Sequence, residues 1–167
     1  YIALKAIYLH EMDRFRRTLA QSLLSPVLST SLYFIVFGSV IGGYVQKIDG
    51  ISYGSYIVPG LLMLTLLTQS ISNTSFGIFF PKFNGTVYEI LAAPISTLEI
   101  VLAFVGAGAT KTLIVGAMIF ITATFFVEVE VKYPLLMIFL LVLVSFTFAL
   151  FGFLIGLMSS NFEQMSI

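Results

Sequence analysis

The sequence predicts an all-α membrane protein, a polytopic bundle of helices that cross the bilayer. Of its 167 residues, 59% are hydrophobic and 10% are charged, whereas a soluble domain carries about 25% charged residues. Three runs, at residues 18–46, 50–81 and 133–162, contain no Asp, Glu, Lys or Arg. Each run exceeds the roughly 20 residues that a helix needs to span the hydrocarbon layer. The sequence lacks the alternating pattern of a transmembrane barrel, so the spans are predicted to be helices.

Residues 1–21 are predicted to form an amphipathic helix before the first span. Apolar side chains recur there at steps of four and three residues, which places them on one helical face. They are Leu4, Tyr8, Met12, Phe15 and Leu19. Arg14, Arg16 and Arg17 lie off this stripe, as expected of a helix that lies in the membrane interface with its cations toward water and lipid phosphates. The alternative is an ordinary solvated helix end.

The chain is predicted to be one membrane domain with spans at about residues 23–44, 56–80, 100–127 and 134–158. The third span is interrupted only by Lys111. Orientation follows from the cations of the short loops, which concentrate on the cytoplasmic side. With the amino terminus inside, the inner segments hold five cations and the outer loops two: Lys5, Arg14, Arg16, Arg17 and Lys82 against Lys47 and Lys132. The amino terminus is therefore predicted to be cytoplasmic.

The polar passage "PKFNGTVYEILAAPISTLE", residues 81–99, separates the second and third spans. Pro81 is predicted to end the second span near Phe80, because proline cannot continue a helix. Two capping boxes are predicted, Thr86 with Glu89 and Ser96 with Glu99. Between them a short cytoplasmic helix is predicted, one that packing must stabilise. It is either a loop that turns the chain back or a docking element that presents Tyr88, Ile90 and Leu91 to a partner.

Lys111 is the most distinctive single residue of the spans. If the helix begins at Ile100, Lys111 lies about 16 Å along it, near the middle of a core of about 30 Å. A charge at that depth is costly and usually faces a pathway or a partner. The alternative is that residues 100–108 lie along the interface and that Lys111 extends toward it.

The second half of the second span is rich in hydrogen-bonding side chains, with Gln69 and Asn73 the largest of them. These groups either face a wet pathway or bond neighbouring helices, which is the commoner use. Two GxxxG pairs, Gly38 with Gly42 and Gly152 with Gly156, would permit close helix approach. Such pairs are frequent by chance and support a dimer only weakly.

Several kinds of chemistry are not predicted. "VGAGATKT" departs from the GxxxxGK[ST] loop at Val105 and Thr110, so no ATP site is visible. A single histidine, His10, and no cysteine offer no metal site, and no catalytic residues can be assembled. A net charge of zero argues against a nucleic-acid partner.

Residues 55–96 contain "YIVPGL", the polar second half of the second span and "YEILAAPIS", and "FGFLIGLMSSNFEQMS" follows later in the chain. These passages carry a resemblance to the membrane subunits of type-2 ABC exporters, and "YEILAAPIS" is similar to the family's Glu-x-Leu-x-x-Pro passage. The resemblance implies six spans, of which four are present, so the chain reads as a fragment. It also implies a dimer of permease subunits and a separate ATPase, which carries the ATP and magnesium and docks on short cytoplasmic helices. The implied docking residues are Tyr88, Glu89, Ile90, Leu91 and Pro94.

The resulting hypothesis is a non-enzymatic permease subunit in the cytoplasmic (inner) membrane. It would move an amphipathic, drug-like or lipid-linked substrate out of the cytoplasm, driven by a partner ATPase, with Lys111, Gln69 and Asn73 as pathway or buried polar residues. Two alternatives remain, an ion-coupled secondary transporter that uses Lys111 and a non-transporting membrane assembly protein.

Overall fold

The computed structural model describes residues 2–41, 47, 48, 50–127, 129 and 131–161, without the side chains of 38–41, 47, 48 and 51. Gly42, one member of the first GxxxG pair, therefore lies outside the described part. The elements in chain order are α1 (Ile2–Arg17), α2 (Leu19–Tyr33), the π-helix η1 (Phe34–Ile41), β1 (Lys47–Ile48), β2 (Ile51–Ser52), α3 (Tyr53–Asn84), α4 (Val87–Ala92), α5 (Thr97–Phe126) and α6 (Pro134–Met158).

The predicted fold class, a polytopic helix bundle, is confirmed. Within the described residues, four helical segments are long and apolar enough to cross a membrane: Leu19–Phe37, Tyr53–Asn84, Thr97–Phe126 and Pro134–Met158. The sequence did not predict the small antiparallel pair β1–β2, in which Lys47 pairs with Ser52 and Ile48 with Ile51. Gly50 turns the chain between these strands with a φ of 83°, a conformation that glycine adopts without strain.

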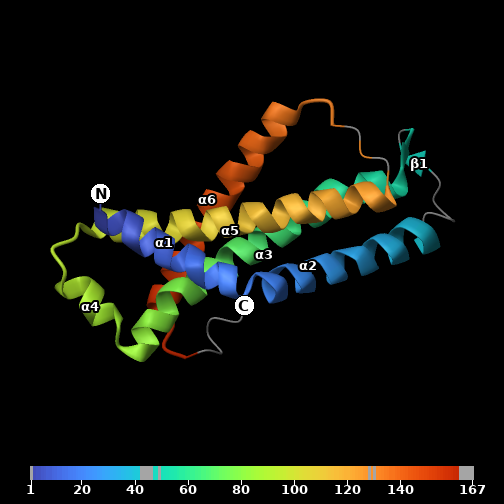
Figure 1. The fold of residues 1–167 in the computed structure, drawn as a ribbon. Coiled ribbons are helices and arrows are strands. Elements are labelled where there is room, and N and C mark those ends of the chain that lie inside the picture. Colours follow the sequence, from blue (N-terminus) through green and yellow to red (C-terminus); the bar gives the residue numbers. More distant parts are fainter. Residues whose placement is uncertain (1, 42–46, 49, 128, 130, 162–167) are drawn as a thin grey trace.

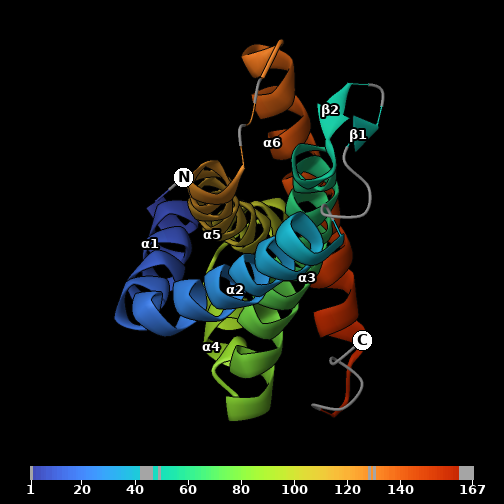
Figure 2. The ribbon, with the colours of Figure 1, turned by 90° about the vertical axis from the view of Figure 1, so that its right-hand side faces the viewer.

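Helices α3 and α5 form the centre of the bundle. They run side by side, α1 and α2 pack against α5, and α6 crosses α3 (Figures 1 and 2). Apolar clusters fill the contacts between these helices, for example Leu62 and Leu66 of α3 against Val115 and Ile119 of α5. The end that carries α4 also holds the last turn of α6, because Lys82 near the end of α3 contacts the backbone there.

Glycines permit the closest approaches between these helices. A Cβ at Gly152 of α6 would lie 2.5 Å from the carbonyl oxygen of Ile71 in α3, and one at Gly156 would lie 2.6 Å from that of Ser75. The second GxxxG pair therefore serves the contact between α6 and α3 inside one chain. On the other side of α3, a Cβ at Gly116 of α5 would lie 2.8 Å from the Leu66 side chain.

The prediction that Pro81 ends the helix near Phe80 is wrong. Helix α3 continues through Pro81 to Asn84 and ends at Gly85, whose left-handed φ of 79° is typical of a helix C-terminus. Proline removes one backbone hydrogen bond, and contacts of the last turn help to offset this loss. Lys82 Nζ donates to the carbonyl oxygens of Leu157 in α6 and of Ser159, the residue after α6, each at 2.8 Å. The rings of Phe79 and Phe83 stack with their centres 6.2 Å apart.

Candidate functional site

The predicted docking segment forms a short helix, α4, on the connection between α3 and α5 (Figure 1). The capping box predicted at Thr86 is wrong, because Thr86 has helical backbone angles and its hydroxyl donates to the carbonyl oxygen of Pro81 at 3.3 Å. Ser96 has the extended backbone of an N-cap residue, yet its hydroxyl makes no capping bond. The hydroxyls of both predicted capping residues therefore leave the helix starts uncapped, whereas Glu99 accepts a hydrogen bond from the Ser96 backbone, which is half of the second predicted box.

Helix α4 exposes most of the residues predicted to dock a partner. Tyr88 is 73% and Leu91 64% exposed, and the side chains of Glu89 and Pro94 are exposed as well. Ile90 differs, because it is half-buried and packs against the core cluster that contains Ile78 and Phe104. One inward side chain thus fixes α4 to the bundle, while an aromatic, an aliphatic and an acidic side chain face outward. Such a surface can bind a protein partner through apolar anchors and a charge.

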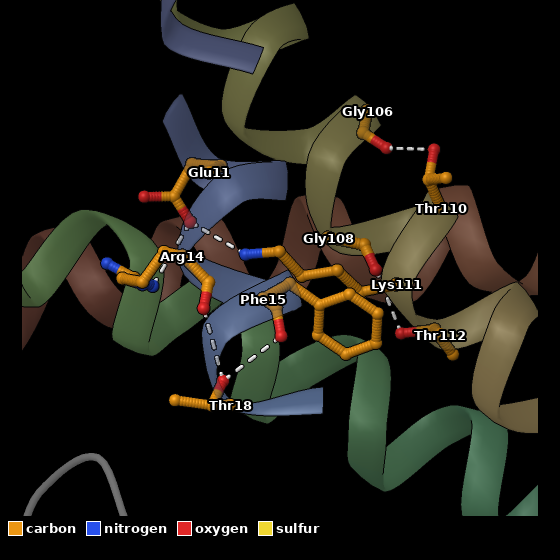
Figure 3. Close-up of polar contacts among 9 residues, drawn as sticks. All are labelled: Glu11, Arg14, Phe15, Thr18, Gly106, Gly108, Thr110, Lys111 and Thr112. Atoms are coloured by element: carbon orange, nitrogen blue, oxygen red, sulfur yellow. Dashed lines mark hydrogen bonds and ion pairs between the residues drawn. The ribbon is translucent and has the colours of Figure 1, made fainter. Parts of the chain in front are cut away.

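Lys111 lies near the middle of α5 and forms a buried ion pair with Glu11 of α1 (Figure 3). Lys111 Nζ donates to Glu11 Oε2 at 2.7 Å, and the residues are 3% and 2% exposed. Arg14 Nη2 lies 3.1 Å from the same carboxylate oxygen. Two cations therefore share one carboxylate, which meets the need of a buried charge for a partner. The contact of Lys111 with a transport pathway stays a prediction.

The helices around this ion pair approach closely. A Cβ at Gly77 of α3 would lie 3.4 Å from Glu11 Oε2, so the carboxylate also faces α3. One turn earlier in α1, the Tyr8 hydroxyl donates to Thr110 Oγ1 at 3.0 Å, and Thr110 in turn donates to the Gly106 carbonyl at 2.8 Å. The Glu11–Lys111 and Tyr8–Thr110 contacts thus join α1 to the half of α5 that is nearer to α4.

Glu11 is the residue that the sequence analysis missed. The signal was present, since steps of three and four residues from Tyr8 to Glu11 and on to Phe15 place this acid on the apolar stripe of α1. An acid on an apolar face requires a partner when that face is buried. The opposite charge inside a span, Lys111, was the natural candidate.

The arginines predicted for the interfacial helix divide into two groups. Arg16 and Arg17 are exposed, whereas Arg14 turns toward Glu11, and its guanidinium lies 5.5 Å from the centre of the Phe76 ring of α3. The apolar stripe of α1 meets protein, because Phe15 is buried and Tyr8 contacts α5. Contact of this helix with lipid phosphates stays a prediction for Arg16 and Arg17.

The polar run of α3 includes residues that bond a neighbouring helix, which confirms one of the two uses that the sequence left open, whereas contact with a wet pathway stays a prediction. Ser70 is buried and donates to the carbonyl oxygen of Ser145 in α6 at 3.2 Å, and Thr74 and Ser75 are buried between helices. Gln69 and Asn73 are half-exposed and bond each other, with Asn73 Nδ2 3.3 Å from Gln69 Oε1. Thr65, Thr68 and Ser72 lie on the same outward face and are half-exposed or exposed. The outward residues form what we call the polar stripe of α3: Thr65, Thr68, Gln69, Ser72 and Asn73.

In the described part of the chain, no three His, Asp or Glu side chains gather. The arrangement is instead that of a helix bundle with a buried ion pair, a polar stripe and an exposed short helix.

Comparisons with known proteins identify relatives along the whole chain. The family described as ABC-2 type transporter matches residues 2–167. The inner membrane transport permease YadH of Escherichia coli is 36% identical over 167 residues, which cover 100% of this chain and 65% of the relative. YadH of Shigella flexneri matches with the same identity and coverage. The chain thus spans 65% of the length of these curated relatives. No solved structure matches significantly.

Proposed function

This chain belongs to the ABC-2 type transporter family, and from that premise we propose that it is the membrane-spanning permease part of an ATP-driven exporter. The exporter moves an amphipathic, drug-like or lipid-linked substrate out of the cytoplasm. ATP and magnesium bind to a separate nucleotide-binding subunit, and two permease subunits, identical or different, form the pathway. The protein lies in the inner membrane with its amino terminus in the cytoplasm.

The exposed helix α4 is the observation that carries this proposal. It lies between two of the membrane-crossing helices, α3 and α5, at one end of the bundle (Figure 1). Tyr88 and Leu91 face outward there, while Ile90 packs against the core. A partner that pushes or pulls α4 therefore acts directly on the ends of α3 and α5. This is the connection that an ATPase needs to change the opening of a pathway.

The polar stripe of α3 supports a pathway along this helix. Polar groups that face hydrocarbon are costly unless they are bonded. The threonine hydroxyls of the stripe bond carbonyl oxygens of their own helix. Among the described residues, the amides of Gln69 and Asn73 make one bond, to each other, so this part of the stripe favours a wet surface or a partner subunit. Gln69 and Asn73 are the members with the most hydrogen-bonding capacity. Lys111 already holds Glu11 in a buried ion pair, so we assign the substrate surface to the stripe.

The test is substitution of the outward face of α4 in the full-length permease, assembled with its ATPase in inverted membrane vesicles. Tyr88→Ala and the double variant Glu89→Ala, Leu91→Asp should release the ATPase from the purified complex. They should also lower ATP-dependent uptake of a probe, ethidium for drug-like substrates or a fluorescent phospholipid for lipid-like ones. The expected loss is about tenfold or more, because apolar anchors dominate the affinity of small interfaces.

Tyr133→Ala is the matched control. Tyr133 precedes α6 at the opposite end of the bundle and is 73% exposed, as Tyr88 is. This variant should keep both ATPase binding and probe uptake. If the α4 variants bind the ATPase and transport as well as the parent does, α4 is only a connecting loop and the docking role is refuted.

A further inference from the structure

The Glu11–Lys111 pair joins residues 100 positions apart in the chain, and it does so inside the protein. Burial of a charge pair seldom adds much net stability, since the loss of hydration offsets the attraction. Loss of one partner is nevertheless costly, because the other charge then stays buried alone. A buried pair of this kind therefore specifies position more than it adds stability.

Three helices meet at the Glu11 carboxylate (Figure 3). Lys111 reaches it from α5, Arg14 from α1 itself, and Gly77 of α3 lies so close that its Cβ would be 3.4 Å away. Arg14 extends the contact to α3 through the ring of Phe76. The carboxylate is thus the common point of α1, α3 and α5.

The pair also determines the position of α1 along α5. A shift of one residue along a helix is about 1.5 Å, and the range of good hydrogen-bond lengths is only about 0.5 Å wide. Such a shift would break both the 2.7 Å contact of Lys111 and the 3.0 Å contact between Tyr8 and Thr110. A slide of α1 on α5 would therefore leave the buried Lys111 without its partner charge, while Glu11 would keep only Arg14 of its own helix.

We infer that Glu11 is a positioning residue of the transport cycle. Through Lys111 and Arg14 it fixes α1 to α5 and α3, so that these helices move as one body when α4 is displaced. The inference rests on the proposed function, in which the partner ATPase displaces α4. Helix α5 follows α4 in the chain, so it passes the movement of α4 to α1. Helix α1 is then a moving part of the permease in addition to any contact with lipid.

The experiment measures the distance between α1 and α5 in the full-length permease with its ATPase in nanodiscs. Spin labels are placed at Leu9→Cys and Ile121→Cys, which are exposed positions on α1 and α5, on a background without other cysteines. The parent should give one narrow distance distribution that is the same with and without ATP. Glu11→Gln and Lys111→Met should broaden it about twofold or more. Glu11→Gln leaves the buried Lys111 without a partner charge, and Lys111→Met removes the bond from α5 to Glu11, which keeps only Arg14 of its own helix.

A second readout separates positioning from mere stability. Transport of ethidium or the fluorescent phospholipid per ATP hydrolysed should fall about tenfold in both single variants, within the range by which residues of a coupling network alter coupling. The double variant Glu11→Gln, Lys111→Met has lost both charges of the pair, so its melting temperature should return toward that of the parent. Its transport per ATP should stay low, because α1 is no longer fixed.

Asp13→Asn is the matched control, since Asp13 is an exposed carboxylate two residues further along α1; it should behave as the parent in every assay. Two results overturn the inference: a narrow, unchanged distance in the single variants, or normal transport per ATP in the double variant. If the parent itself transports neither probe, that result counts against the proposed function. The distances measured without ATP still decide in that case whether Glu11 fixes α1 to α5.

Discussion

The contact between α3 and α6 predicts a large effect for one added methyl group, in Gly152→Ala. A Cβ at Gly152 would lie 2.5 Å from the Ile71 carbonyl oxygen, 2.8 Å from its Cα and 3.0 Å from its carbonyl carbon. Non-bonded carbon atoms prefer about 3.5–4.0 Å, so the two helices must separate by about 1 Å. All three atoms belong to the backbone and cannot rotate away. Overpacking of this kind costs about 1–3 kcal/mol.

Gly60→Ala in α3 is the matched control, because nothing lies within 4 Å of the Cβ that it would add. Alanine favours a helix over glycine by about 1 kcal/mol, a gain that both variants share. The difference between the variants therefore isolates the steric cost. In thermal unfolding of the detergent-purified permease, the melting temperature of Gly152→Ala should lie below that of Gly60→Ala by about 2–4 °C for each kcal/mol of steric cost. Equal melting temperatures would refute the close approach of α6 to α3.

Two further predictions concern the ends of the bundle. Lys82→Met should lower the free energy of unfolding by about 1 kcal/mol, because the charge-assisted bonds to the end of α6 are lost from an exposed site. Lys82→Arg should retain most of this stability. An unchanged melting curve for Lys82→Met would contradict the role of Lys82 in holding α6. For orientation, cysteines at Ser52 and Lys132 should react with an impermeant thiol reagent from outside intact cells, and cysteines at Thr86 and Arg16 should not. Outside labelling at Thr86 would reverse the topology.

The fold class could be predicted from the sequence because the membrane imposes a simple rule on composition. Backbone groups in hydrocarbon must be bonded within the chain, so a long run without charge is a helix. The run at residues 133–162 illustrates this, since α6 occupies Pro134–Met158. The membrane boundaries themselves stay predictions, as helices extend past the hydrocarbon. Helix α3 has 32 residues, more than the roughly 20 that a span requires.

Local rules failed where distant contacts decided the structure. The helix-breaking effect of Pro81 is outweighed where the last turn of α3 packs on α6, and no local rule includes Lys82 and its bonds to that helix. Thr86 had the spacing of a capping residue, but the continued helix placed the Pro81 carbonyl within reach of its hydroxyl. Glu11 was missed because a sequence does not say which residues meet across 100 positions. The signals were its place on the apolar stripe and the opposite charge of Lys111 inside a span.

Polar groups within the apolar part of this chain occur in two different settings, and the difference bears on their roles. Where helices touch, the groups are small or paired: the Ser70 hydroxyl bonds the backbone of Ser145, and Lys111 bonds Glu11. These satisfied groups hold helices in a defined arrangement, whereas the buried hydroxyls of Thr74 and Ser145 have no hydrogen-bond partner among the described residues. On the outward face of α3, Gln69 and Asn73 bond each other and keep further hydrogen-bonding capacity at a half-exposed surface. Unused capacity suits a surface that meets changing partners, water or substrate, so under the proposed function the stripe is better placed than Lys111 to contact a substrate.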